Sequence, residues 1–267
     1  MARIMIISSF VTIGHVGLSA GQPVCQRLGV NVTSVPTVVL SNHPGWPEVA
    51  RAPVAAEHIV AMAETLSSNG WLADHEAVLV GYMPTVEHVD AAAALLARVS
   101  EVADKPRIVV DPILGDWPNG LYVSEGVAQA VRDRLVPLAN TMTPNLFELE
   151  WLSQRKCMTV DDTKCAAQAL DIETVHVTSA PLGWEKTGIL SLSGGEFHEY
   201  CTPRYPDVPH GVGDVFAALI AANFQVGQAV GYVCALARSS QGQEHLNIVD
   251  ASADWVSAPA IAATRKD

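Results

Sequence analysis

The chain has 267 residues, 49% of them hydrophobic and only 16% charged, so it can bury a large core and is not expected to be disordered. Its 16 Lys and Arg residues face 28 Asp and Glu residues, a formal net charge of −12. A nucleic-acid-binding protein normally carries a basic surface, so this balance argues against a nucleic-acid partner. An anionic small molecule would have to be held locally, by backbone N–H groups, a divalent metal or a few basic side chains.

In the first half of the chain, short β-branched runs alternate with longer helical patterns. The apolar runs predict strands at residues 4–8, 32–40, 77–81 and 108–110. The helical patterns between them predict helices at residues 19–28, 53–69 and 85–102, the first two followed by a terminating glycine. Each strand is therefore followed by a segment long enough to cross over to a parallel neighbour.

The second half continues this alternation and then adds a hairpin. Helices are expected at residues 124–135, 146–153, 161–170, 213–223 and 228–240, and strands at residues 141–143 and 174–178. Gly194-Gly195 predicts a tight turn between strands at residues 187–192 and 196–202. No element is assigned after Asp250. The pattern predicts a single α/β domain over residues 1–267, doubly wound, with a mostly parallel central sheet and helices on both faces.

Several common signatures are missing from the sequence. It has neither a G-x-x-x-x-G-K-[ST] loop nor a G-x-G-x-x-G fingerprint, and its histidines and cysteines form no zinc-binding pattern. Its five cysteines are scattered, which favours reduced thiols and a cytoplasmic protein. Its apolar runs are shorter than the roughly 20 residues that span a bilayer, so no membrane association is expected.

The most informative segment is Gly211-Val212-Gly213-Asp214, directly before an Ala-rich helical run. Glycines at a helix N-terminus leave backbone N–H groups free to face an anion, such as a phosphoryl group in transfer. Asp214, in the first turn, could then take the proton from an attacking alcohol. The same residues would equally suit a tight turn with Asp214 as a partner of the helix dipole.

Two further segments follow buried strands. Asp111 ends the strand at residues 108–110 and precedes Asp116, so its carboxylate could hold Mg²⁺ or simply open a turn. Asn145 and Glu148 have the spacing of a capping box, which explains them structurally, although Glu148 could also face a metal.

A third group of residues suits a flat aromatic ligand. Ser41-Asn42-His43 and the aromatic Trp46 follow one strand, and Gly81-Tyr82 follows another. Tyr82 could stack on a ring in this position, and the alternative is an ordinary surface turn.

Taken together, these segments resemble the pyridoxal kinases of the ribokinase-like superfamily. The resemblance runs from about residue 4 to about residue 240 with the motifs in the family's order. It rests on Ser9, Gly14-His15-Val16-Gly17, Arg27-Leu28-Gly29, Ser41-Asn42-His43, Gly81-Tyr82, the segments 111–116 and 143–148, Val177-Thr178-Ser179 and Gly211-Val212-Gly213-Asp214. It implies ATP-dependent phosphorylation of the 5′-hydroxymethyl group of pyridoxal, pyridoxine or pyridoxamine.

The resemblance also implies a role for each matching residue. Asp214 would be the general base, and the N–H groups of Gly211, Val212 and Gly213 would hold the transferring phosphoryl group. Asp111, Asp116 and Glu148 would surround Mg²⁺ and the ATP phosphates. The other implied residues are Tyr122, Asn145, Thr178 and Ser179 on the nucleotide side and Ser9, His43 and Tyr82 at the pyridine ring. A K⁺ ion, a homodimer and a cytoplasmic location are further expectations from the family.

The sequence departs from the family on the substrate side. Phe10 stands where His is common, Pro44 where Thr is usual and Trp46 where Tyr is usual, which points to an altered preference among the vitamers. Near the expected nucleotide-covering segment 201–209, Arg204 or Lys186 could reach ATP, and the favoured interpretation of each is an exposed charge. Two alternatives stay open: a related kinase of hydroxymethylpyrimidine or another heteroaromatic alcohol, and a non-catalytic vitamer-binding protein on the same fold.

Overall fold

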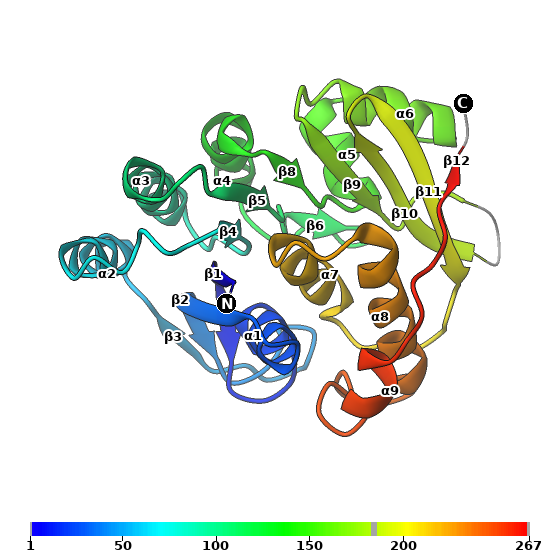
Figure 1. Ribbon diagram of the computed structural model, residues 1–267, viewed down its shortest axis with the longest axis horizontal. Helices are drawn as coiled ribbons and strands as arrows, with labels where there is room; N and C mark the ends of the chain where they lie inside the picture. The colour runs from blue at the N-terminus through cyan, green and yellow to red at the C-terminus, as the bar shows by residue number, and fades with distance from the viewer. Residues whose placement is uncertain (1, 183–185, 266–267) are drawn as a thin grey trace.

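A computed structural model describes residues 2–182 and 186–265, and over these residues the chain forms a ten-stranded sheet with helices on both faces (Figure 1). The strand order is β12-β11-β10-β9-β8-β5-β4-β1-β2-β3. The central strands are β1 (Arg3–Val11), β2 (Asn31–Leu40), β4 (Ala77–Val80), β5 (Arg107–Val110), β8 (Thr141–Met142) and β9 (Thr174–Thr178). These six pair in parallel, which confirms the expected α/β fold with a mostly parallel sheet.

Antiparallel strands complete both edges of the sheet. They are β3 (Arg51–Pro53) at one edge and β10 (Lys186–Ser193), β11 (Glu196–Pro203) and β12 (Thr264–Arg265) at the other. The β10–β11 hairpin turns at Gly194-Gly195, as predicted, and both glycines have positive φ.

Two helical layers bury alternate residues of the same strands. One core contains Met5, Ile7, Val78 and Val80 and is covered by α2 (Ala56–Ser68), α3 (Val86–Val102) and α4 (Glu125–Ala130). The other contains Ile4, Ile6 and Leu79 and is covered by α1 (Leu18–Arg27), α7 (Val212–Ala221), α8 (Val226–Ser239) and α9 (Ser252–Val256). This alternation is the period of two expected when both faces of a parallel sheet are covered.

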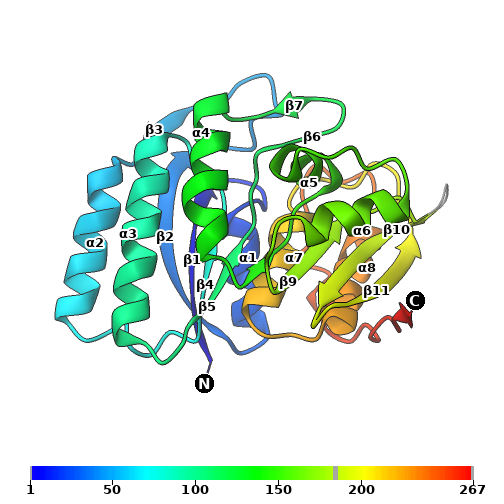
Figure 2. The same cartoon turned by 90° about the horizontal axis from the view of Figure 1, so that it is seen from above.

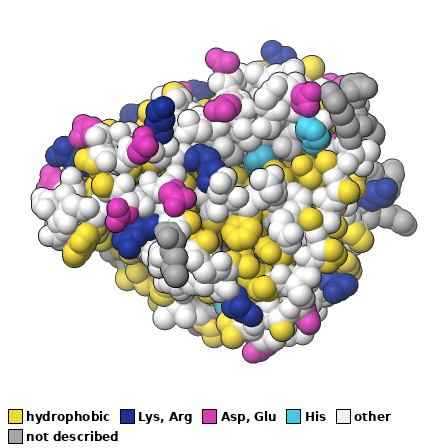
Figure 3. Space-filling view, in the orientation of Figure 1, with side chains coloured by type: hydrophobic (Ala, Val, Ile, Leu, Met, Phe, Trp, Pro, Cys, Tyr) yellow, Lys and Arg dark blue, Asp and Glu magenta, His cyan; other side chains and the backbone are white. Residues whose placement is uncertain are grey.

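A third, smaller core lies under α5 (Leu146–Ser153) and α6 (Val160–Gln168), which pack on β9 and β10. On the face shown in Figure 3, hydrophobic side chains gather toward the middle, over the region of α7 and α8. In the core on this side of the sheet, Tyr232 of α8 packs edge-on against both Phe224 and Trp255. No helix among the described residues has the length and apolarity needed to cross a membrane.

Four local expectations were wrong or incomplete. The helix expected from residue 53 begins at Ala56, because residues 51–53 form the edge strand β3, where a proline is tolerated. The helix expected at residues 124–135 is α4 followed by a π-helical turn (Val131–Leu135) and a 3₁₀ turn (Val136–Leu138). The tail beyond residue 250 contains α9 and β12. A two-stranded sheet of β6 (Gly115–Asp116) and β7 (Gly120–Leu121) was not predicted.

The small sheet marks the functional edge of the molecule. In Figure 2, β6 and β7 lie at the edge opposite the N-terminus, beyond the carboxyl ends of the central strands. Parallel α/β sheets bind ligands at this edge, where strand ends meet helix N-termini.

Candidate active site

Two cavities open at this edge of the sheet and share one wall. The hairpin cavity, about 640 Å³, is lined by Asp116, Ser179, Thr202, Arg204 and Cys234 among others. The strand-end cavity, about 600 Å³, is lined by Ser9, His43, Tyr82, Asp111 and Asp214 among others. The residues that line both cavities are Asn145, Thr178, His210, Gly211 and Gly213. A group passing from one cavity to the other would therefore pass the N-terminus of α7.

The N-terminus of α7 has the form that the glycines predicted. Gly211 is the N-cap with φ +110°, and a Cβ there would lie 1.9 Å from the carbonyl oxygen of His15, so a larger residue does not fit. At Gly213 a Cβ would meet no described atom within 4 Å. Because Gly211 and Gly213 line both cavities, the first turn of α7, whose N–H groups have no partner within the helix, lies at the junction of the two.

Asp214 lies in this first turn, half-buried at the strand-end cavity. Burial raises the pKa of its carboxyl to about 6, although hydrogen bonds from the backbone N–H groups of Gly17 and of Asp214 itself oppose the rise. A carboxylate with a pKa close to the operating pH is well suited to accept a proton.

Gly17 is the N-cap of α1 and brings that helix against the end of β1. It has φ +55°, and a Cβ would lie 2.3 Å from the carbonyl oxygen of Ser9 and 2.5 Å from its hydroxyl oxygen. Only glycine allows this approach, so the N-terminus of α1, which carries the N–H donor to Asp214, lies directly against Ser9 of β1.

Asp111 follows β5 and is 8% exposed. Burial, together with the neighbouring carboxylates of Glu148 and Asp214, raises its pKa well above the usual value, and the Thr143 hydroxyl opposes this rise. Asp111 therefore lies close enough to Glu148 and to Asp214, which come from separate segments of the sequence, to be repelled by both carboxylates.

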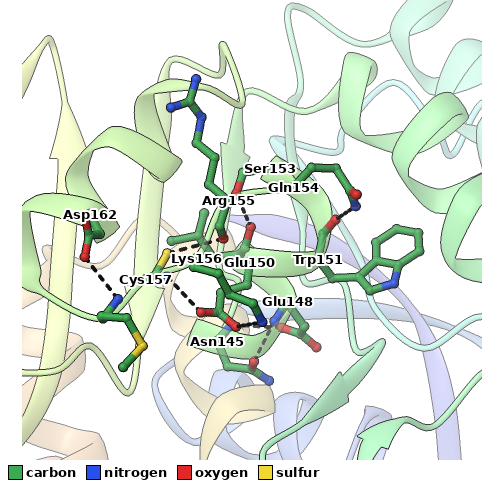
Figure 4. Close-up of polar contacts among 12 residues, drawn as sticks. Asn145, Glu148, Glu150, Trp151, Ser153, Gln154, Arg155, Lys156, Cys157 and Asp162 are labelled. Atoms are coloured by element: carbon green, nitrogen blue, oxygen red, sulfur yellow. Dashed lines mark hydrogen bonds and ion pairs between the residues drawn. The ribbon is translucent and has the colours of Figure 1, made fainter.

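Glu148 and Asn145 form the capping box at the start of α5 (Figure 4). The Asn145 side chain accepts from the Glu148 N–H at 3.0 Å, and Glu148 Oε2 accepts from the Asn145 N–H at 2.8 Å. Glu148 Oε1 also accepts from the Leu114 N–H at 2.9 Å. Burial nevertheless raises the pKa of Glu148 to about 7. This residue ties α5 to the segment after β5 and adds an acidic group beside Asp111.

Asp116 is the last residue of β6, and Tyr122 directly follows β7. Asp116 lines the hairpin cavity and accepts a hydrogen bond from the Asn119 side chain at 2.8 Å. Tyr122 lines the strand-end cavity, and burial together with the Asp116 carboxylate raises the pKa of its phenol. Asp116 thus faces Tyr122 and Asn119, and its carboxylate also contributes to the raised pKa of Glu148.

The acidic residues fit Mg²⁺ rather than a metal held entirely by protein ligands. Within the described part of the chain, no group of three or more His, Cys, Asp or Glu side chains is arranged to hold an ion. Mg²⁺ commonly uses one or two carboxylates and completes its shell with water and substrate phosphates. Burial raises the pKa of both the Asp111 and the Glu148 carboxyl, so a bound cation would stabilise their ionised forms.

Of the residues expected on the nucleotide side, Asn145, Thr178 and Ser179 line the hairpin cavity, whereas Tyr122 lines the strand-end cavity. Thr178 ends β9, its N–H donates to the Pro144 carbonyl at 2.8 Å, and Ser179 follows with φ +55°. Arg204, read from the sequence as an exposed charge, is exposed and also lines this cavity, whereas Lys186 is exposed and does not line it.

The expected ring contacts gather around the strand-end cavity. Ser9, His43 and Tyr82 all line it, together with Pro44, whereas Phe10 does not and Trp46 lines a neighbouring cavity. Sequence reasoning missed Arg51 and His210, which also line the strand-end cavity. Arg51 belongs to the unpredicted strand β3, and the isolated imidazole of His210 carries no periodic signal.

Comparison with known proteins agrees with this geometry. A family model described as phosphomethylpyrimidine kinase matches residues 14–239. A pyridoxine/pyridoxal/pyridoxamine kinase from Bordetella avium is 34% identical over 84% of this chain and 78% of its own length. A pyridoxal kinase from Granulibacter bethesdensis is 33% identical over 81% of this chain and 79% of its own length.

Among solved structures, pyridoxal kinase from Leishmania donovani in complex with ADP and pyridoxamine superposes with a TM-score of 0.91. That similarity covers 100% of both chains at 26% sequence identity. The sheet order, the paired cavities and the sequence similarity lead to one conclusion: this chain belongs to the pyridoxal kinase family of the ribokinase-like superfamily.

Proposed function

We propose that this protein transfers the γ-phosphoryl group of ATP to the 5′-hydroxymethyl group of pyridoxal and related B6 vitamers. The observation that supports this most directly is the position of the α7 N-terminus, between a cavity suited to a nucleotide and a cavity lined by Ser9, His43 and Tyr82. The names of the related kinases agree with this substrate class.

Asp214 acts as the general base in this reaction. As the alcohol oxygen attacks the γ-phosphorus, its proton passes to the Asp214 carboxylate. The bond between the γ-phosphorus and the bridging oxygen breaks, and ADP leaves. The N–H groups of Gly211, Val212 and Gly213 stabilise the charge on the phosphoryl oxygens during transfer.

The acidic residues hold the metal and the nucleotide. Asp111 and Glu148, with Asp116 at the hairpin cavity, are the residues that would hold Mg²⁺ and its water shell. When bound, Mg²⁺ supplies charge neutralisation for the ATP phosphates. Asn145 and Thr178 on the shared wall, with Ser179 at the hairpin cavity and Tyr122 at the strand-end cavity, position the nucleotide by hydrogen bonding.

Three further properties belong to this proposal. The enzyme works as a cytoplasmic homodimer with only small-molecule substrates, and K⁺ accompanies Mg²⁺. Size-exclusion chromatography with light scattering checks the oligomeric state, and activity in K⁺ against Na⁺ buffers checks the monovalent ion.

The substrate assay tests the proposal directly. Purified protein is incubated with ATP and Mg²⁺ and, in separate reactions, with pyridoxal, pyridoxine, pyridoxamine or hydroxymethylpyrimidine, and phosphorylated product is measured by mass spectrometry. Turnover with one or more B6 vitamers is expected. Turnover with hydroxymethylpyrimidine alone would assign the protein to the related kinase activity, and no turnover with any alcohol would reject the proposal.

A further inference from the structure

Two histidine rings join the substrate side of the site to the α7 N-terminus. His43 lies in the loop after β2, and His210 immediately precedes Gly211, the N-cap of α7. Their ring centroids are 4.1 Å apart with an interplanar angle of 18°, a stacked arrangement. The pair is therefore a direct contact between the loop at the strand-end cavity and the turn that would hold the phosphoryl group.

The backbone around His43 determines which ring nitrogen carries the proton. The Gly45 N–H donates to His43 Nδ1 at 3.0 Å, so Nδ1 is the acceptor and the proton of the neutral ring is on Nε2. Pro44 lies between these two residues, and its fixed φ limits the turn that makes this hydrogen bond. A Cβ at position 45 would lie 3.0 Å from Nδ1, so glycine gives the loop its close approach.

The other nitrogen of His43 is available to a ligand. Nε2 has no hydrogen-bond partner within residues 2–182 and 186–265, and it is not among the buried polar atoms there. The ring lines the strand-end cavity and a third, rim cavity of about 420 Å³, which Trp46 and His245 also line. His43 thus offers a neutral N–H donor at the place proposed for the heteroaromatic substrate.

His210 has the position needed to hold that donor in place. It lines the hairpin, strand-end and rim cavities, and its ring makes no hydrogen bond to another described residue. The stack on His43 is its one ring contact among the described residues. A shift of the α7 N-terminal turn would therefore displace the support of the His43 ring.

We propose that His210 is a positioning residue that, by stacking on His43, aims the His43 Nε2–H at a hydrogen-bond acceptor of the heteroaromatic substrate. The contact also couples seating of that substrate to the geometry of the phosphoryl-binding turn. This proposal rests on the proposed function for its substrate and on the ring geometry for its mechanism.

Steady-state kinetics of matched variants test the positioning role. His210→Ala removes the ring, His210→Phe keeps a flat ring without nitrogen, and His58→Ala removes an exposed imidazole from α2 as a control. An aromatic pair is worth about a 2- to 10-fold effect, so His210→Ala should raise KM for the vitamer by about that factor. KM for ATP should change less, and His210→Phe and His58→Ala should keep the wild-type KM for the vitamer. An equal rise of both KM values in His210→Ala, or none, would overturn the proposal.

Nitrogen-15 NMR of the imidazole groups gives a readout that does not depend on activity. In the wild-type protein, His43 should show a protonated Nε2 and an unprotonated Nδ1. In His210→Ala the unstacked His43 ring should turn more freely and its hydrogen bond from the Gly45 N–H should weaken, so these signals should move toward the average of the two tautomers, and in His210→Phe they should stay. A His43 spectrum unchanged in His210→Ala would reject the positioning role. Absence of vitamer turnover in a wild-type protein with the expected spectrum would instead reject the proposed function.

Discussion

The backbone N–H of Gly17, the N-cap of α1, donates a hydrogen bond to the carboxylate of Asp214 in the first turn of α7. This contact connects the loop between β1 and α1 to the proposed general base. It depends on a glycine with positive φ that lies against the Ser9 backbone.

Replacing Gly17 by Ala should therefore lower the activity, and the loss should be larger than the backbone strain of a positive-φ alanine would cause by itself. The added Cβ would clash with Ser9 and move the donor away from Asp214, and we expect kcat to fall by about 10²-fold. Gly29→Ala is a matched control, because Gly29 also has a positive φ, +81°, and a Cβ added there would meet no described atom within 4 Å. It should lose about 1 kcal/mol of stability and keep its activity. Equal activity of the two variants would contradict this interpretation.

Replacing Asp214 by Asn should remove the base and keep the shape of the site. We expect kcat to fall by about 10²–10⁴-fold, while the dissociation constant for ATP, measured by calorimetry, changes little. Asp254→Asn, at the exposed first turn of α9, is the control for loss of a helix-dipole partner and should have wild-type activity. A wild-type kcat in Asp214→Asn would show that Asp214 is not the general base and interacts only with the dipole of α7.

The sequence predicts the parts of the site that follow a buried strand or open a helix. Asp111, Thr178 and the capping pair Asn145 and Glu148 could be placed this way, because parallel strands end at one edge of the sheet. The repulsion between Asp111 and Glu148 could not be predicted from the sequence, because it depends on how deeply both side chains are buried. Their roles toward metal and nucleotide stay predictions.

Strands that form only by pairing with a distant strand could not be predicted from the sequence. Residues 51–53 have weak strand propensity and become β3 only by pairing with the end of β2, and β12 likewise forms only against β11. His210 was missed for the same reason, because its significance comes from the distant residue His43 that it stacks upon. Local pattern carries no information about such contacts.

Replacing Asp111 by Asn should stabilise the metal-free protein while impairing catalysis. Because burial and neighbouring carboxylates raise the Asp111 pKa, its ionised form destabilises the fold near neutral pH, and the amide removes that charge. We expect a gain of about 0.5–2 kcal/mol, measured by denaturant unfolding in EDTA, with a smaller stabilisation by Mg²⁺–ATP than in the wild type. Asp104→Asn, at an exposed site, should change neither quantity. A destabilised Asp111→Asn protein in EDTA would contradict the proposed unpaired charge.

Acid sensitivity should arise in part from His176, which is buried on β9 and pairs with Ser191 of β10. Its Nδ1 lies 2.9 Å from the Ser191 hydroxyl oxygen, its ring packs edge-on against Phe216 of α7, and burial lowers its pKa to about 4.

The unfolded chain, with a histidine pKa near 6.5, takes up a proton that the folded chain resists. The contribution of His176 is therefore complete above about pH 6.5 and is lost progressively as the pH falls toward 4, on the order of 3 kcal/mol in total. Glu148 and Asp214, with raised pKa values, oppose this trend over part of the same range, so the comparison must be made between variants.

His176→Gln can keep a hydrogen bond to Ser191 but does not titrate. Its free energy of unfolding, measured by urea titration at intervals from pH 4 to 7.5, should fall less steeply with acid than that of the wild type. His58→Gln, on the exposed face of α2, should follow the wild-type curve. Parallel curves for His176→Gln and the wild type would show that protonation of His176 does not limit acid stability.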